Sequence, residues 1–283
     1  MAAFALTRDL NYSTYCIENA CGFGFAEPTT SITDFILGVV LVAMAVVMLT
    51  LNRSMLAITW SVAWVLLGVA FVLGGLHHFL ALDVLCSDHT KLCRRFDWYW
   101  IFSILTQCPA VTLMMVATVQ LTIKPLNQIV IWAIFGVLVF AYTISVIIAV
   151  VVGAAFPLTF IFVAIFLLPS VLGMIVVLSL PVCCRYRPPL YLTATSERKR
   201  ASVLALAGWA LCVFSLVWQP TKIGIHKHFN HNDIFHVLLT IGLIICACGI
   251  IPLTSAKARE DAGAPAKDDA KIKPTMATII ADL

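Results

Sequence analysis

The sequence predicts an all-α, polytopic membrane protein built as a bundle of seven transmembrane helices. Of its 283 residues, 61% are hydrophobic and only 11% are charged, whereas about a quarter of the residues in a soluble domain are charged. The chain also contains seven apolar stretches of roughly 20 residues or more, the length that crosses a bilayer as a helix. Backbone groups in hydrocarbon must be hydrogen-bonded within their own segment, so each stretch is expected to be helical.

The seven stretches divide the chain into three parts. They lie at 32–51, 55–82, 98–123, 126–152, 158–180, 201–219 and 233–253. We therefore expect an outer N-terminal segment at 1–31, a transmembrane domain at 32–253 and a tail at 254–283. The tail is rich in Ala, Lys and Asp and has no apolar period, so we expect it to be disordered and cytoplasmic.

The distribution of basic residues predicts the orientation of the helices. Lys and Arg near span ends are retained on the cytoplasmic side of a membrane. With seven spans, most Lys and Arg residues, including Arg185, Arg187 and the run "ERKR" at 197–200, fall on the face of the C-terminus. We expect a lumenal or extracellular N-terminus, in an endomembrane or the plasma membrane. The bilayer is the expected partner, other membrane subunits are candidates, and no nucleic acid is expected.

Two kinds of residue on the predicted outer face agree with this orientation. Asn11 begins the triplet "NYS", an N-glycosylation acceptor pattern that functions only on such a face. Cys16, Cys21, Cys86 and Cys93 lie in outer segments, where disulfides can persist. Their spacing does not say which cysteines pair, and free thiols facing a reducing compartment are the alternative.

The centres of the seven stretches contain no ionisable residue. This disfavours a voltage sensor and a transmembrane proton relay, because both require charged or titrating groups within the bilayer. A retinal pigment is also disfavoured, since the seventh stretch has no Lys to form a Schiff base. A transporter of soluble ligands is a third-ranked alternative, because the sequence has no internal repeat.

All the histidines fall on the predicted outer side, near the end of the second stretch and the start of the seventh. They are His77, His78, His89, His226, His228, His231 and His236. Asp83 and Asp233 lie in the same two regions. Imidazole and carboxylate groups are the ligands that zinc takes, with three protein ligands and a water in catalytic sites. The sequence therefore offers a zinc site between these two helices.

Helix geometry limits which side chains converge. Residues four apart share a helix face, so Asn232 and His236 do, whereas His231 and His236 diverge by about 140° unless His231 lies before the helix. We expect His78, rather than His77, to point inward. The alternative for "NHND" at 230–233 is an ordinary helix start, because Asn caps helices and Asp suits the first turn. A polar pocket for another ligand is the third interpretation.

The layout of seven helices, with His at the outer end of the second and a His-bearing start of the seventh, resembles the superfamily of alkaline ceramidases, progestin and adiponectin receptors and haemolysin III proteins. That resemblance implies zinc held by one His of helix two and two of helix seven, activating water for lipid amide hydrolysis. His78 or His77 would match the first ligand, His236 the last, and Asp83 or Asp233 the acid. The sequence differs in having Asn232 where the other seventh-helix His belongs, and Leu73 or Gly74 where a Ser belongs.

Three segments, "EPTTSITDFILG", "LLGVAFVLGGLHHF" and "FNHNDIFHVL", are more similar to an uncharacterised family of seven-helix membrane proteins. That similarity implies the fold and no activity.

Two functional hypotheses follow, one for an enzyme and one for a non-enzymatic membrane protein. In the first, His78, His236 and either His231 or Asp233 hold zinc, which supplies hydroxide for attack on the carbonyl of a lipid substrate. Asp83 would then act as general base or orient a ligand. In the second, the protein is a non-enzymatic receptor-like binder or a structural subunit of a membrane assembly, and the polar mouth is a helix cap or contact surface.

Overall fold

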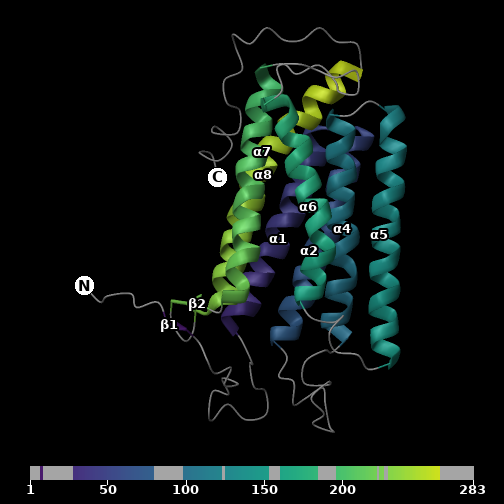
Figure 1. Ribbon diagram of the computed structural model, residues 1–283. Coiled ribbons are helices and arrows are strands. Elements are labelled where there is room, and N and C mark those ends of the chain that lie inside the picture. The colour runs from purple at the N-terminus through teal and green to yellow at the C-terminus, as the bar shows by residue number, and fades with distance from the viewer. Residues whose placement is uncertain are drawn as a thin grey trace, which may run out of the picture.

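The computed structural model describes residues 7–8, 28–79, 98–122, 125–152, 160–183, 196–221, 223–225 and 229–261. Within these ranges, seven helices are long and apolar enough to cross a membrane, which confirms this part of the prediction. They lie side by side as one bundle (Figure 1). Their bounds are α1, Pro28–Leu51; α2, Met55–Phe79; α4, Trp98–Thr122; α5, Pro125–Val152; α6, Phe160–Cys183; α7, Ser196–Trp218; and α8, His231–Asp261.

The first helix begins earlier than the apolar pattern predicts. Pro28 is the first helical residue, and the fixed φ of proline suits the start of a helix, where its missing N–H is not needed. The polar residues Thr30, Thr33 and Asp34 therefore belong to the first two turns of α1. This start brings three polar side chains into the bundle at its predicted outer end.

The last helix continues beyond the expected end of the seventh span at residue 253. Residues 254–261, which we had assigned to the tail, are helical, as suits a segment rich in the strong helix formers Ala, Lys, Arg and Glu. The hydroxyl of Thr254 donates to the carbonyl of Ile251, so this polar group is satisfied within the helix. Residues 262–283 lie outside the described ranges.

Small residues allow α7 and α8 to pack closely along their length. A Cβ atom at Gly208 would overlap the backbone nitrogen of Cys246, and one at Gly249 would overlap the backbone of Ala205. Such close backbone approach favours helix association in lipid, where apolar side chains gain nothing by leaving the lipid tails. Helices α7 and α8 therefore form a closely packed pair beside the site described below.

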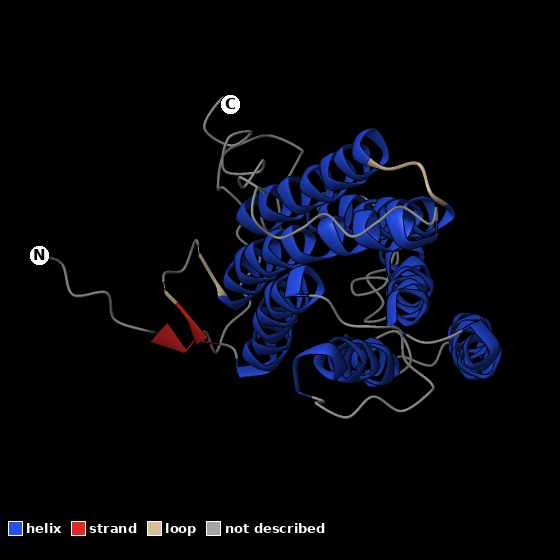
Figure 2. Cartoon of the chain, turned by 90° about the horizontal axis from the view of Figure 1, so that it is seen from above, coloured by secondary structure: helices blue, strands red, loops and turns tan. Residues whose placement is uncertain are grey.

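Helix α5 stands at the edge of the bundle, next to α4 (Figures 1 and 2). The buried hydroxyl of Tyr142 in α5 donates to the carbonyl of Ile104 in α4 over 2.8 Å. The rings of Phe162 and Phe166 in α6 lie 6.0 and 5.3 Å from the Tyr142 ring. One polar contact and one aromatic cluster thus join α5 to its neighbours.

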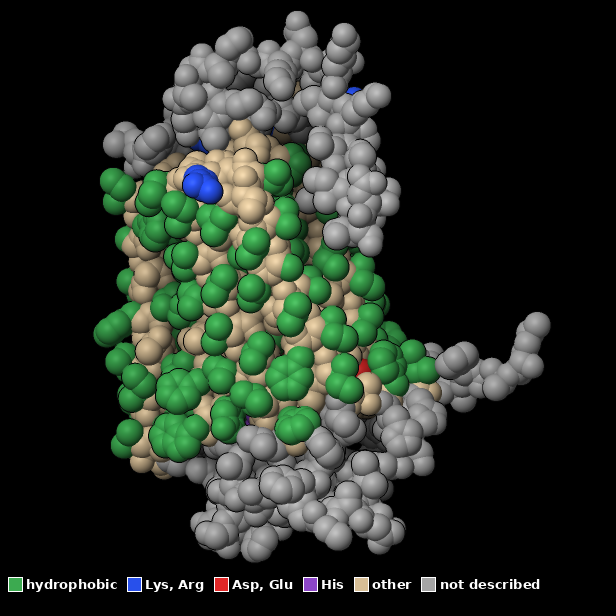
Figure 3. Space-filling view, turned by 180° about the vertical axis from the view of Figure 1, so that it is seen from behind, with side chains coloured by type: hydrophobic (Ala, Val, Ile, Leu, Met, Phe, Trp, Pro, Cys, Tyr) green, Lys and Arg blue, Asp and Glu red, His purple; other side chains and the backbone are tan. Residues whose placement is uncertain are grey.

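The surface of the bundle suits contact with lipid. Hydrophobic side chains cover the helical face seen in Figure 3 from one end to the other. Arg53, Lys199, Arg200 and Lys257 come from helix ends or connections at the end that we predict to be cytoplasmic. A soluble monomer rarely exposes so large an apolar area.

A two-stranded antiparallel ladder joins Thr7 and Arg8 to the connection between α7 and α8. Strand β1, Thr7–Arg8, pairs with β2, Ile223–Gly224, with Thr7 opposite Gly224. A 3₁₀ turn at Gln219–Thr221 leads from α7 into β2. The pairing places β1 at the same end of the bundle as the start of α8 (Figure 1).

Candidate functional site

A cavity of about 140 Å³ lies in the half of the bundle that contains the start of α8. This space is similar to that of an engineered protein cavity that holds a benzene molecule. Its polar lining residues are Asp34, His78, Ser103, Gln107, Gln219, Asn232 and His236. Its apolar lining residues include Leu67, Phe71, Val171, Leu239 and Leu243. The cavity is therefore amphiphilic, with a polar end and an apolar interior.

The polar end is centred on a contact between the first and last helices of the bundle. Nε2 of His236 in α8 lies 3.2 Å from Oδ1 of Asp34 in α1. Both side chains are buried. A buried carboxylate is costly unless it is paired and hydrogen-bonded, and His236 supplies the partner.

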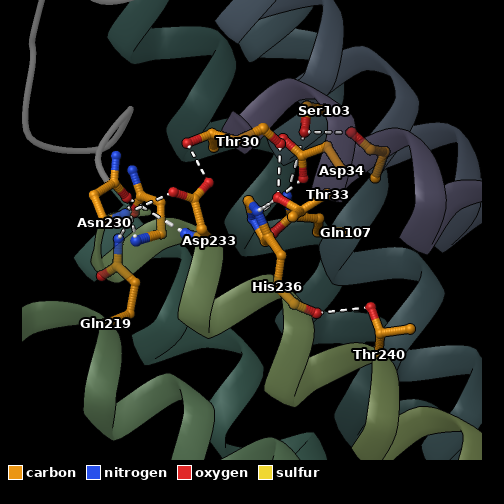
Figure 4. A network of polar contacts seen from close by, with 12 residues as sticks. Thr30, Thr33, Asp34, Ser103, Gln107, Gln219, Asn230, Asp233, His236 and Thr240 are labelled. Carbon is orange, nitrogen blue, oxygen red and sulfur yellow. Dashed lines mark hydrogen bonds and ion pairs between the residues drawn. The ribbon is translucent and has the colours of Figure 1, made fainter. Parts of the chain in front are cut away.

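Two threonines fix the position of His236 (Figure 4). The Thr33 hydroxyl lies 3.2 Å from Nδ1 of His236 and also donates to the carbonyl of Thr30. The Thr240 hydroxyl donates to the backbone carbonyl of His236 over 2.7 Å. An ionised Asp34 can only accept, so its pairing with His236 requires a proton on Nε2, and the direction of the contact between Nδ1 and Thr33 depends on the protonation of the ring. Nε2 then faces Asp34 and the cavity, so this pair can exchange a proton or a hydrogen bond with a bound molecule.

Asp233 closes the start of α8 and also ties it to α1. Its two carboxylate oxygens accept from the Thr30 hydroxyl at 2.9 Å and from the Asn230 backbone N–H at 2.7 Å. The Asn230 side chain in turn accepts from the backbone N–H groups of Asn232 and Asp233. This reciprocal pattern is a capping box. The helix-cap interpretation of "NHND" therefore accounts for Asn230 and Asp233, and the catalytic role expected for Asp233 stays a prediction.

Polar groups of α2, α4 and the end of α7 extend the polar end. His78 of α2 lines the cavity, whereas the ring of His77 lies against Trp100. Ser103 of α4 donates to the carbonyl of Ala70 and accepts from the amide of Gln107.

The amide of Gln219 donates to Asn232 over 3.1 Å. This bond sets the end of α7 level with the start of α8.

The described residues do not form a three-ligand zinc site. Among them, no group of three or more His, Cys, Asp or Glu side chains is arranged to hold a metal ion. Both ring nitrogens of His236 already contact Thr33 and Asp34. His231 is buried in the first turn of α8 and is not part of the cavity lining. Of the three predicted zinc ligands, the cavity therefore brings together His78 and His236, and zinc stays a prediction.

Several predicted residues lie outside the described ranges. They are the candidate base Asp83, the glycosylation acceptor Asn11 and the candidate disulfide cysteines Cys16, Cys21, Cys86 and Cys93. Their predictions are neither supported nor opposed by the geometry.

Sequence reasoning missed Asp34, the one acidic residue among the described residues that line the cavity. Asp34 lies in the second turn of α1, away from the span centres at which the sequence has no ionisable residue. A signal was present in "EPTTSITDFILG", because a carboxylate within an apolar span is functional by default. The same segment contains Thr30 and Thr33, which contact α8.

The fold and the cavity define a class of protein: a bundle of seven long apolar helices that encloses an amphiphilic pocket near one end. Within this class, the chain belongs to DUF6962, a family of unknown function whose match covers residues 29–255. The matched region includes the described helices, apart from Pro28 and residues 256–261, and all the described residues that line the cavity. No curated protein and no solved structure matches the chain.

Proposed function

We propose that this protein is a receptor-like binder of a lipid-like amphiphile, inserted in a bilayer with a lumenal or extracellular N-terminus. The observation that carries the proposal is the amphiphilic cavity. Apolar pockets with a few convergent polar groups are the usual sites of small-molecule binding. The polar head of the ligand would lie at Asp34, His78 and His236, and its chain would lie along Leu239, Leu243 and Val171.

The charges at the cavity favour an uncharged head group. Among the described residues that line the cavity there is no Lys or Arg, and Asp34 supplies a carboxylate. A phosphate or carboxylate head would face this carboxylate without a fixed cation, which is unfavourable in a low-dielectric site. A head such as a primary amide can both donate to Asp34 and accept from an imidazole N–H.

Binding of octadecanamide to the purified protein in lipid nanodiscs tests the proposal. The substitution Leu239→Trp adds bulk to the cavity lining. Ile241→Trp adds the same side chain two positions away, on the exposed face of the same helix. We expect saturable binding that Leu239→Trp abolishes and Ile241→Trp preserves. Binding that responds equally to the two substitutions, or no saturable binding, would contradict the proposal.

A zinc-dependent lipid amide hydrolase is the second candidate. The specific observation in its favour is that His78, Asp34 and His236 line one cavity. Elemental analysis of the purified protein tests it, with a variant that combines His78→Ala and His236→Ala as the control. About one zinc ion per chain, lost in the variant, would support this candidate, and equal metal content in both proteins would reject it.

A further inference from the structure

A second polar group lies deeper in the same cavity. Trp209 of α7 lines the cavity and is 3% exposed. Its indole Nε1–H is buried and has no hydrogen-bond partner among the residues that the structure describes. Buried donors are nearly always paired, because an unpaired one loses its bonds to water without replacement. An unpaired donor at a cavity is therefore a position where a ligand can supply the missing acceptor.

The indole of Trp60 provides the comparison. It is also buried, and its Nε1–H also has no partner within the described ranges. Trp60 lies near the start of α2, packs against Trp64 and is not part of the cavity lining. The two tryptophans thus share one property, the unpaired donor, and differ in that Trp209 lines the cavity and Trp60 does not.

The helices give the depth of Trp209 relative to the polar end. The bond between Gln219 and Asn232 places these two residues at one level. With a helical rise of 1.5 Å per residue, Trp209 lies about 15 Å below Gln219 and His236 about 6 Å below Asn232. Trp209 is therefore about 9 Å deeper than His236. The close approach of the neighbouring Gly208 to Gly242 and Cys246 agrees with this depth.

We propose that the Nε1–H of Trp209 selects ligands that carry an acceptor oxygen on their apolar part, about 9 Å inward from the head group. A keto, ester or amide carbonyl at this position would accept the bond. Most other residues at this depth, such as Leu243 and Leu67, are apolar, so a plain alkyl chain would fill the space and leave the donor unpaired. The inference rests on the binding function proposed above and deepens it, because it names a feature of the ligand.

The test compares two probe molecules on three forms of the full-length protein. The probes are octadecanamide and an octadecanamide with a keto group about 9 Å from the amide. The protein forms are the native chain, Trp209→Phe and Trp60→Phe. Phenylalanine keeps an aromatic ring and removes the N–H donor. The ratio of the two affinities is the readout, so a general loss of packing that weakens both probes equally leaves it unchanged.

We expect the native chain and Trp60→Phe to bind the keto probe about three- to tenfold more tightly than the plain amide, the effect of one hydrogen bond. In Trp209→Phe this preference should disappear. The indole N–H resonance of Trp209, assigned by its loss in Trp209→Phe, should shift with the keto probe and not with the plain amide.

Failure of the inference is distinct from failure of the binding function. If the native chain binds both probes with equal affinity, or if Trp209→Phe keeps the preference, the role of Trp209 is refuted while binding in the cavity stands. If the native chain binds neither probe, the proposed binding function is itself refuted, together with the inference that depends on it.

Discussion

Nε2 of His236 lies 3.2 Å from the carboxylate of Asp34, so that the first and last helices of the bundle meet through a buried polar pair. The pair faces a cavity whose deeper walls are apolar. One helical turn away, a second bond links the same two helices: the Thr30 hydroxyl donates to Asp233, and these two residues are 203 positions apart in sequence. These contacts fix the register of α1 and α8 and present two polar groups to a ligand.

Asp34→Asn should weaken ligand binding. The substitution keeps the shape of the side chain and removes the charge that pairs with His236. Charge-assisted hydrogen bonds contribute about 1.5–3 kcal/mol, so octadecanamide affinity should fall about tenfold or more. Isothermal titration in nanodiscs measures this change. Asp233→Asn is the control, because Asp233 does not line the cavity, and its affinity should stay within about twofold of native.

Asn230→Ala should destabilise the protein without touching the cavity. Asn230 caps α8 through its side chain, which accepts from two backbone N–H groups. Loss of such a cap costs about 1 kcal/mol, and unfolding in a detergent titration measures it. A variant as stable as the native chain would show that the start of α8 is held by other contacts.

Gly208→Ala and Gly136→Ala should have opposite effects on stability. A Cβ atom at Gly208 overlaps the backbone of α8, whereas one at Gly136 meets no atom within 4 Å among the described residues. Overpacking costs about 1–3 kcal/mol, while alanine in place of an unhindered helical glycine gains about 0.5–1 kcal/mol. Thermal unfolding of the two variants in one detergent measures the difference, and equal melting temperatures would contradict the packing of α7 against α8.

Tyr142→Phe should loosen α5 selectively. The substitution keeps the ring that packs on Phe162 and Phe166 and removes the hydroxyl that donates to Ile104. The carbonyl of Ile104 still has its helical bond, so the expected loss of stability is about 1 kcal/mol. Hydrogen exchange should rise in α5 and stay constant in α8; a uniform rise in all helices would argue against a local role.

The sequence predicted the helices well because each apolar stretch is a local signal. Every predicted span is helical over most of its length, and the errors are at the ends, as at Pro28 and residues 254–261. The site was predicted only in part. His78 and His236 were found from their residue type, whereas Asp34 was missed because the polar pair depends on how α1 packs against α8. The carboxylate in an apolar span was a local signal for Asp34 itself, but its pairing with a distant segment has no local pattern.

Different residues in and after the "NHND" segment fit different interpretations of that segment. Asn230 and Asp233 form a helix cap, as an ordinary helix start predicts. His236, one turn further on, faces the cavity. One segment thus contains both a structural group and a candidate ligand-binding group, and composition alone could not assign each residue to its role.

Photo-crosslinking with an octadecanamide that carries a diazirine on its chain is the most direct test of a ligand-binding cavity. After irradiation in nanodiscs, mass spectrometry locates the labelled residues. Our account predicts label on Leu239, Leu243 or Val171, which line the cavity, and loss of this label with excess unlabelled octadecanamide. Label confined to lipid-facing residues such as Ile129 and Val137 of α5, and unaffected by competition, would contradict it.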